Sequence, residues 1–318
     1  MTDEKFELDY LSKFNSFFNT AKFSSTYKLV FLKSIMDISE FVESNEKSVL
    51  GHNWIKKHGN ILRVDLDFIA IRYAKYYWDM FFKFRLRQSQ HPDDVSIHKF
   101  FTKDGEPIRP PKIEDLASRD YDVLRKQIIT ASISPQVLKK LIGEIDFYKR
   151  IPYKPYIEFD SRIVSFLHKF RGILIPAINY HLTRYLEKRN SSLQIAEKVS
   201  GKVPRDYLTP KEKKYLMRFH KKCFYCDKHD LDDYHIDHVI PFDYVFHTDV
   251  FNCVPACVDC NSSKSNRLPK EEFFDKVVLR NEKIKTSPNY SKEWYEKLYK
   301  DCIFEYHRKR KFFEPECD

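Results

Sequence analysis

Four cysteines in the last third of the chain form two Cys-x2-Cys pairs. The first pair is Cys223 and Cys226, and the second, about 30 residues later, is Cys257 and Cys260. Each pair offers two sulfurs from one tight turn, and a tetrahedral zinc ion needs two such turns. The spacing therefore predicts a structural zinc site with four thiolate ligands.

Residues between and just after these pairs carry groups suited to phosphodiester hydrolysis. Asp237 and His238 lie in the apolar run 236–241, which predicts a short strand that ends at its proline. A neutral histidine accepts a proton from water, and a carboxylate binds a divalent cation through oxygen. Asn261, directly after Cys260, offers a second oxygen ligand whose direction the zinc site would fix.

Lys264 completes the candidate set. It follows Asn261 by three residues, so both side chains would share one side of the helix expected there, where an ammonium group can meet a phosphate. A base for water and a cation held by oxygen ligands suffice for the reaction, because the cation stabilises charge on the phosphate and the leaving oxygen. A single Asp-His pair is far more often a surface pair, so it is the combination with both cysteine pairs that favours catalysis.

The ordered pattern Cys-x2-Cys, Ile-Asp-His-Val-Ile-Pro, Phe-Asn and Cys-x2-Cys-Asn-Ser-Ser-Lys resembles the HNH endonuclease family in its zinc-knuckle form. The resemblance covers residues 220–270 and implies a ββα-metal fold, with two strands and a helix around one catalytic ion. It implies that His238 is the general base and that Asp237 and Asn261 bind catalytic Mg²⁺ or Mn²⁺. It also implies that Asn252 braces the loop and orients His238, and that the four paired cysteines hold structural Zn²⁺.

The motif departs from the family pattern in two places. The last motif residue, usually His, is Asn261, a variation that occurs within the family. The Gly pair that often follows the proline is replaced by Phe-Asp-Tyr-Val-Phe, which leaves the conformation of residues 242–251 open.

Several neighbouring side chains have more than one interpretation. His235 would lie on the same strand face as Asp237, either supporting a metal or phosphate or making a structural hydrogen bond. Cys253 is excluded from the zinc site because the paired spacing favours the other four cysteines. Surface positions are expected for three further histidines, His220, His229 and His247.

The preceding part of the chain predicts mainly helices. It is poor in glycine, with only six in the whole chain, and its apolar residues recur at helical spacing. The aromatic and basic segment 66–87 is either a buried central helix or a surface that stacks on bases and contacts phosphates. Residues 163–189 predict a long helix that ends or kinks at Pro176.

We expect a mainly α protein with two domains. Gly201 and Pro204 mark residues 199–208 as the boundary between a helical domain at 1–200, for substrate recognition or regulation, and an HNH domain at 209–318. The HNH domain would be a ββα-metal unit with a four-cysteine zinc site, opened by a capping box at Thr209. Helices are expected at 269–281 and 291–311, and the basic run 307–311 is either a phosphate contact or a solvated helix end.

Composition narrows the class of partner and compartment. The net charge of +10 favours an anionic partner, here DNA. All seven cysteines fall in the last hundred or so residues, which suits a metal site in a reducing cytoplasm better than a secreted disulfide framework. The acidic N-terminus does not resemble a signal peptide, and no apolar run approaches the roughly 20 residues that span a bilayer, so a cytoplasmic protein without membrane contact is expected.

The expected function is a metal-dependent endonuclease that cuts DNA in bacterial restriction or phage defence. A non-catalytic zinc-knuckle module that binds nucleic acid is one alternative. A mobile-element or homing nuclease is another, although no second DNA-binding repeat is visible, and a secreted DNase toxin would need a trafficking signal. Cutting both strands with one such site generally requires two protomers, so a homodimer or a regulatory partner protein is expected.

Overall fold

A computed structural model describes residues 3–21, 23, 25–43, 54–88, 100–103, 106–107, 121–138, 141, 145–203, 205–228, 233–284, 290–305 and 311–315. The chain divides into two compact units, Met1–Arg189 and Asn190–Asp318. Helices dominate both units, as the sequence predicts. None of the described helices is long and apolar enough to cross a membrane.

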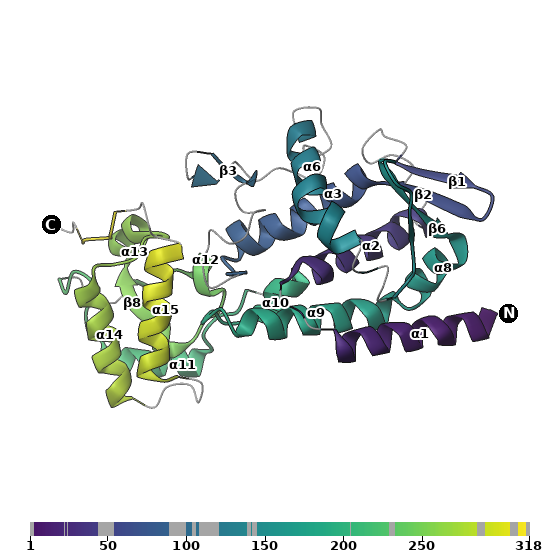
Figure 1. Cartoon of the computed structure of the whole chain (residues 1–318). Coiled ribbons are helices and arrows are strands. Elements are labelled where there is room, and N and C mark those ends of the chain that lie inside the picture. The colour runs from purple at the N-terminus through teal and green to yellow at the C-terminus, as the bar shows by residue number, and fades with distance from the viewer. Residues whose placement is uncertain are drawn as a thin grey trace. The chain divides into compact units, whose positions relative to one another are not determined.

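The N-terminal unit is built mainly from helices (Figure 1), and many of its buried side chains are aromatic. Phe68, Tyr73 and Tyr77 are each at most 1% exposed, so the segment 66–87 contains a buried central helix, as one of its two interpretations predicted. The described helices of the N-terminal unit are α1 (Asp3–Thr20), α2 (Tyr27–Glu43), α3 (Leu66–Trp78), the π-helical η1 (Asp79–Lys83), α6 (Asp122–Ile128), the π-helical η4 (Ile129–Leu138), α8 (Ser161–Lys169) and α9 (Arg171–Glu187).

The same unit contains a four-stranded antiparallel sheet that the sequence analysis did not predict. Its order is β1 (Ile55–His58), β2 (Ile61–Asp65), β6 (Tyr156–Asp160) and β5 (Lys149–Arg150). The β1–β2 turn consists of Gly59 and Asn60, and Gly59 has φ +58°, a conformation that costs glycine little and suits a two-residue hairpin turn. Two further short strands, β3 (Thr102–Lys103) and β4 (Glu106–Pro107), pair antiparallel with each other.

The long helix expected at residues 163–189 is interrupted, but not at Pro176 as predicted. The break lies at Phe170, between α8 and α9, and Pro176 lies inside α9. Pro176 and Gly172 are both exposed, so the carbonyl of Gly172, which loses its helical partner at the proline, can bond to water instead. The helix therefore tolerates the proline without ending.

The C-terminal unit contains the ββα arrangement that the resemblance implied. Strand β7 (Tyr234–His238) pairs antiparallel with β8 (Cys253–Cys257), with His238 opposite Cys253, and α13 (Val258–Lys264) follows β8 directly. The remaining elements are α10 (Ile195–Ser200), α11 (Pro210–Leu216), the 3-10 turn η5 (Met217–Phe219), α12 (Phe242–Val245), the 3-10 turn η6 (Val250–Asn252), α14 (Glu271–Lys283) and α15 (Lys292–Glu305).

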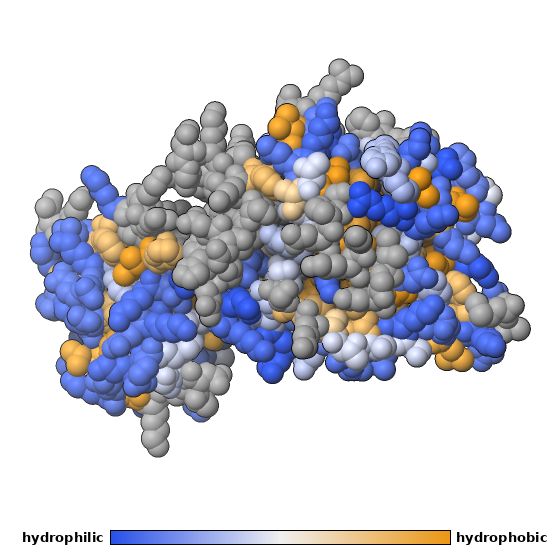
Figure 2. All heavy atoms as spheres, viewed as in Figure 1, coloured by the Kyte–Doolittle hydropathy of each residue, from blue (hydrophilic) through white to orange (hydrophobic). Residues whose placement is uncertain are grey.

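The two last helices form the core that supports the strands. The rings of Phe274 on α14 and Tyr299 on α15 stack with centroids 4.0 Å apart, and Tyr295 is fully buried. Buried Arg280 donates to the backbone carbonyls of Cys253 and Val250 at 2.6 and 2.8 Å, which fixes the start of β8. On the face shown in Figure 2 the surface of this unit is predominantly hydrophilic, with small separate apolar areas.

The entry to the C-terminal unit lies earlier than the expected boundary at 199–208. Helix α10 belongs to this unit, because the buried ammonium group of Lys198 donates to the carbonyl of Tyr244 at 3.2 Å. The capping box is present as predicted: Glu212 N donates to Thr209 Oγ1 and Thr209 N to Glu212 Oε2, at 3.3 and 2.7 Å. His229 and residues 307–310 of the basic run lie outside the described residues.

Candidate active site and zinc centre

The four predicted zinc ligands lie together. The Sγ atoms of Cys223, Cys226, Cys257 and Cys260 are all within 4.8 Å of one another, and those of Cys226 and Cys257 are 4.0 Å apart. Four sulfurs at the usual zinc distance in a tetrahedron would be about 3.8 Å apart, so this cluster fits a zinc ion. Cys253 is buried at the start of β8 and is not part of the cluster, which agrees with its exclusion on spacing.

Local structure explains how the two cysteine pairs meet. Phe224 N donates to Pro255 O at 3.0 Å, which ties the first turn to β8. Cys257 ends β8 and caps α13, where Cys260 N donates to its Sγ at 3.5 Å. The four-cysteine cluster thus joins β8 to α13, the helix that carries Asn261.

His238 is held by a hydrogen-bonded chain that also fixes its tautomer. Its Nε2 lies 3.0 Å from Thr248 Oγ1, and that hydroxyl donates its proton to the carbonyl of Asp206 at 3.0 Å. Because a hydroxyl has only one proton, Nε2 must be the donor to Thr248, and Nδ1 keeps its lone pair. Burial is the main cause that lowers the pKa of His238 to about 4, so the ring is neutral near pH 7 and Nδ1 can accept a proton.

The segment that begins at Arg205 is anchored beside this histidine. The carboxylate of Asp206 lies 2.8 Å from His247 Nδ1 and accepts from Thr248 N at 3.0 Å. The pKa of His247 is raised by Asp249, two residues further along the chain, and by Asp206. The expected surface position of His247 is therefore wrong, because its ring is half-buried between two carboxylates.

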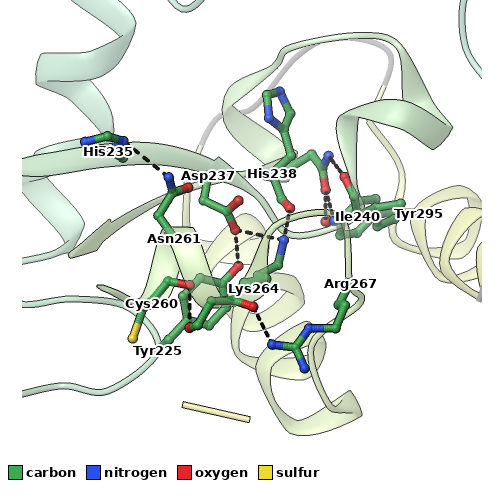
Figure 3. A network of polar contacts seen from close by, with 12 residues as sticks. Tyr225, His235, Asp237, His238, Ile240, Cys260, Asn261, Lys264, Arg267 and Tyr295 are labelled. Atoms are coloured by element: carbon green, nitrogen blue, oxygen red, sulfur yellow. Dashed lines mark hydrogen bonds and ion pairs between the residues drawn. The ribbon is translucent and has the colours of Figure 1, made fainter. Parts of the chain in front are cut away.

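Asp237 makes its polar contacts through one carboxylate oxygen. Oδ2 accepts from the Tyr225 hydroxyl at 2.5 Å and lies 2.9 Å from Lys264 Nζ. Lys264 also donates to the carbonyl of His238 (Figure 3), with 2.7 Å between Nζ and the oxygen, and its side chain is 0% exposed. The predicted phosphate contact of Lys264 is not supported, since packing of α13 on β7 turns its ammonium group into the protein.

Asn261 is oriented by His235. Its Nδ2 lies 3.2 Å from His235 Nδ1, and Figure 3 shows the amide oxygen on the side of Asp237. Asp237, His238 and Asn261 all line one cleft of about 420 Å³. A carboxylate and an amide oxygen are ligands that Mg²⁺ and Mn²⁺ prefer, so this pair fits the predicted cation, and His235 makes the structural hydrogen bond that was one of its two interpretations.

Asn252 braces the backbone that follows β7. Its Nδ2 donates to Ile240 O at 2.8 Å, and its Oδ1 accepts from Ile240 N and from the Tyr295 hydroxyl at 2.9 and 2.8 Å. The segment after Pro241, where the family's Gly pair is missing, forms the short helix α12. This helix ends at Phe246, whose φ is 55°. This geometry suits the bracing role that the resemblance implied for Asn252.

Several residues around the site escaped sequence reasoning. Two of them support His238: Thr248 bonds to its ring, and Asp206 accepts the Thr248 proton. A third, Tyr225, donates to Asp237. No periodic pattern in the sequence links these residues to the ones they contact. His220 was expected at the surface, but it is half-buried beside Arg280, where burial is the main cause that lowers its pKa to about 4. The only early sign for Tyr225 is its place inside the first cysteine pair.

Two strands and a helix carry the four-cysteine cluster and, beside it, the cleft lined by Asp237, His238 and Asn261, which is a ββα arrangement. Residues 223–267 match the family model described as HNH endonuclease, so this segment is an HNH domain. No curated protein and no solved structure gives a significant match to the chain. Arg205 and Asp206 lie outside the matched segment.

Proposed function

We propose that the C-terminal unit is a metal-dependent endonuclease that hydrolyses phosphodiester bonds of DNA. The observation that carries the proposal is the orientation of His238: Thr248 takes its Nε2–H, which leaves Nδ1 as a base on a ring that lines the same cleft as Asp237 and Asn261. A purely structural zinc module would not need a neutral histidine held in one tautomer beside two oxygen ligands.

In the proposed reaction, His238 Nδ1 takes a proton from a water molecule as the water oxygen forms a bond to phosphorus. The bond from phosphorus to the leaving oxygen breaks, and that oxygen takes a proton from solvent. A divalent ion held by Asp237 and Asn261 would stabilise the negative charge that builds on the phosphate. Lys264 and Tyr225 position Asp237, and Asn252 positions the backbone after His238.

DNA is the proposed substrate because the net charge of +10 favours an anionic polymer. The HNH domain is small, so the N-terminal unit is proposed to supply substrate recognition or control. This combination supports a role in restriction or phage defence, with a homodimer or a regulatory partner as the form that acts on both strands.

The test is incubation of the purified full chain with supercoiled plasmid and Mg²⁺ or Mn²⁺. Wild type and His168→Ala, a control at an exposed histidine on α8, should cut, whereas His238→Ala and all samples with EDTA should not. Equal cleavage by His238→Ala would refute the assigned base. Binding to DNA with no cleavage of methylated, unmethylated or single-stranded substrates would favour the non-catalytic module.

A further inference from the structure

A second cleft adjoins the candidate active site within the C-terminal unit. It has a volume of about 450 Å³, and Tyr207, Tyr234 and Lys213 contribute to its walls. The two clefts share a border, and the residues that line both of them are Arg205, His235, Ile236 and His238. A molecule bound in the second cleft would therefore lie next to the proposed base.

Arg205 stands at the border between the clefts. Its guanidinium carbon is 5.6 Å from the ring centroid of Tyr207, in the second cleft, and 5.6 Å from that of Phe242, in the first. Its side chain is exposed, and it forms no ion pair with a carboxylate among the residues that the structure describes. The positive charge of Arg205 is thus available to an anion in either cleft.

The position of Arg205 is coupled to that of the base. The next residue, Asp206, accepts the Thr248 proton through its carbonyl, and Thr248 in turn accepts from His238. Asp206 is also held by His247. A short hydrogen-bonded path therefore holds Asp206, and with it the backbone that carries Arg205, next to His238.

The charges of the two clefts favour a polyanion. Asp237 and Asp206 are each paired with a cationic or hydrogen-bonding partner, Lys264 and His247, whereas Arg205 and Lys213 are exposed. A guanidinium group matches two phosphate oxygens in one plane. Tyr207 is 70% exposed, so its ring can stack on a base, a contact that depends little on sequence.

We propose that the second cleft is a subsite for the nucleotide next to the scissile phosphate. Arg205 contacts the phosphate at the border of the clefts, Tyr207 stacks on the adjoining nucleoside, and Lys213 lies toward the next phosphate. This inference rests on the proposed nuclease function, but it concerns binding and can be tested without turnover.

The probes are a fluorescent oligodeoxynucleotide and an abasic deoxyribose-phosphate oligomer of equal length, with binding followed by anisotropy without added Mg²⁺ or Mn²⁺, so that His238 and its hydrogen bonds stay in place. Tyr207→Ala should weaken binding of the oligodeoxynucleotide about 10-fold and leave the abasic oligomer unchanged, because only the base contact is lost. Arg205→Ala should weaken both probes and reduce the slope of log affinity against log salt by about 1. Lys211→Ala, an exposed lysine on α11 that lines neither cleft, is the matched control.

Zinc content and thermal unfolding show whether each variant is folded. If Arg205→Ala and Tyr207→Ala match Lys211→Ala on both probes, the subsite is wrong even where the wild type cleaves DNA. If the wild type cleaves nothing but these binding differences hold, the second cleft stands as a nucleotide-binding site and the hydrolytic function fails.

Discussion

The ammonium nitrogen of Lys264 lies 2.9 Å from Oδ2 of Asp237, in a position with 0% exposure for the lysine. The pair joins α13 to β7 and, with the Tyr225 hydroxyl, fixes one oxygen of the proposed metal ligand. A buried charge pair of this kind costs stability when one member is removed, because the other remains uncompensated.

Lys264→Met should destabilise the C-terminal unit by about 3–5 kcal/mol, since it leaves the Asp237 carboxylate buried without its cation. The double variant Lys264→Met/Asp237→Asn should recover much of that loss. Urea unfolding of the zinc-loaded protein measures both effects. Unchanged stability together with weaker DNA binding would instead support the phosphate contact that the sequence predicted for Lys264.

Thr248→Val should lower kcat on the order of 100-fold with little change in KM, because it removes the hydroxyl that orients His238. Thr248→Ser keeps the hydroxyl and should recover most of the rate. Nitrogen NMR of the His238 ring reports the tautomer directly: the proton should be on Nε2 in the wild type. A wild-type rate in Thr248→Val would show that the Asp206–Thr248–His238 chain does not position the base.

Cys226→Ser should abolish the zinc content of the purified protein and destabilise the C-terminal unit, since structural zinc contributes free energy on the order of 10 kcal/mol. Cys253→Ala is the matched control, as Cys253 is buried outside the four-sulfur cluster, and it should retain one zinc per chain. Elemental analysis measures the zinc content of the two variants, and thermal unfolding measures their stability. Normal zinc content in Cys226→Ser would overturn the ligand assignment.

The contact between His247 and Asp206 should make stability depend on pH. The pKa of His247 is raised above its usual 6.5 by Asp249 and Asp206, so its contribution is complete below that value and is lost as pH rises through the raised pKa. The stability difference between wild type and His247→Gln should therefore be larger at about pH 6 than at about pH 9. Urea midpoints of both proteins at the two pH values test this, and a difference independent of pH would contradict it.

Features that depend on short spacing could be predicted from the sequence. The cysteine pairs, the capping box at Thr209, the strand that carries Asp237 and the helix after Cys257 all form within one or two turns of chain, where residue type and spacing limit the geometry. The hairpin at Gly59 belongs to the same class, and its two-residue turn was a signal that could have been used. The family resemblance added roles for His238, Asn252 and Asn261.

Contacts between distant segments could not be predicted in the same way. Helical spacing correctly placed Lys264 near Asn261, but only the packing of α13 on β7 buries that lysine and pairs it with Asp237. The hydrogen bond from His238 to Thr248 depends on how loops far apart in sequence fold together, and so does the position of Arg205 in the cleft that His238 lines. Burial and long-range packing determine which charges neutralise one another and which face a substrate, and neither follows from spacing along the chain.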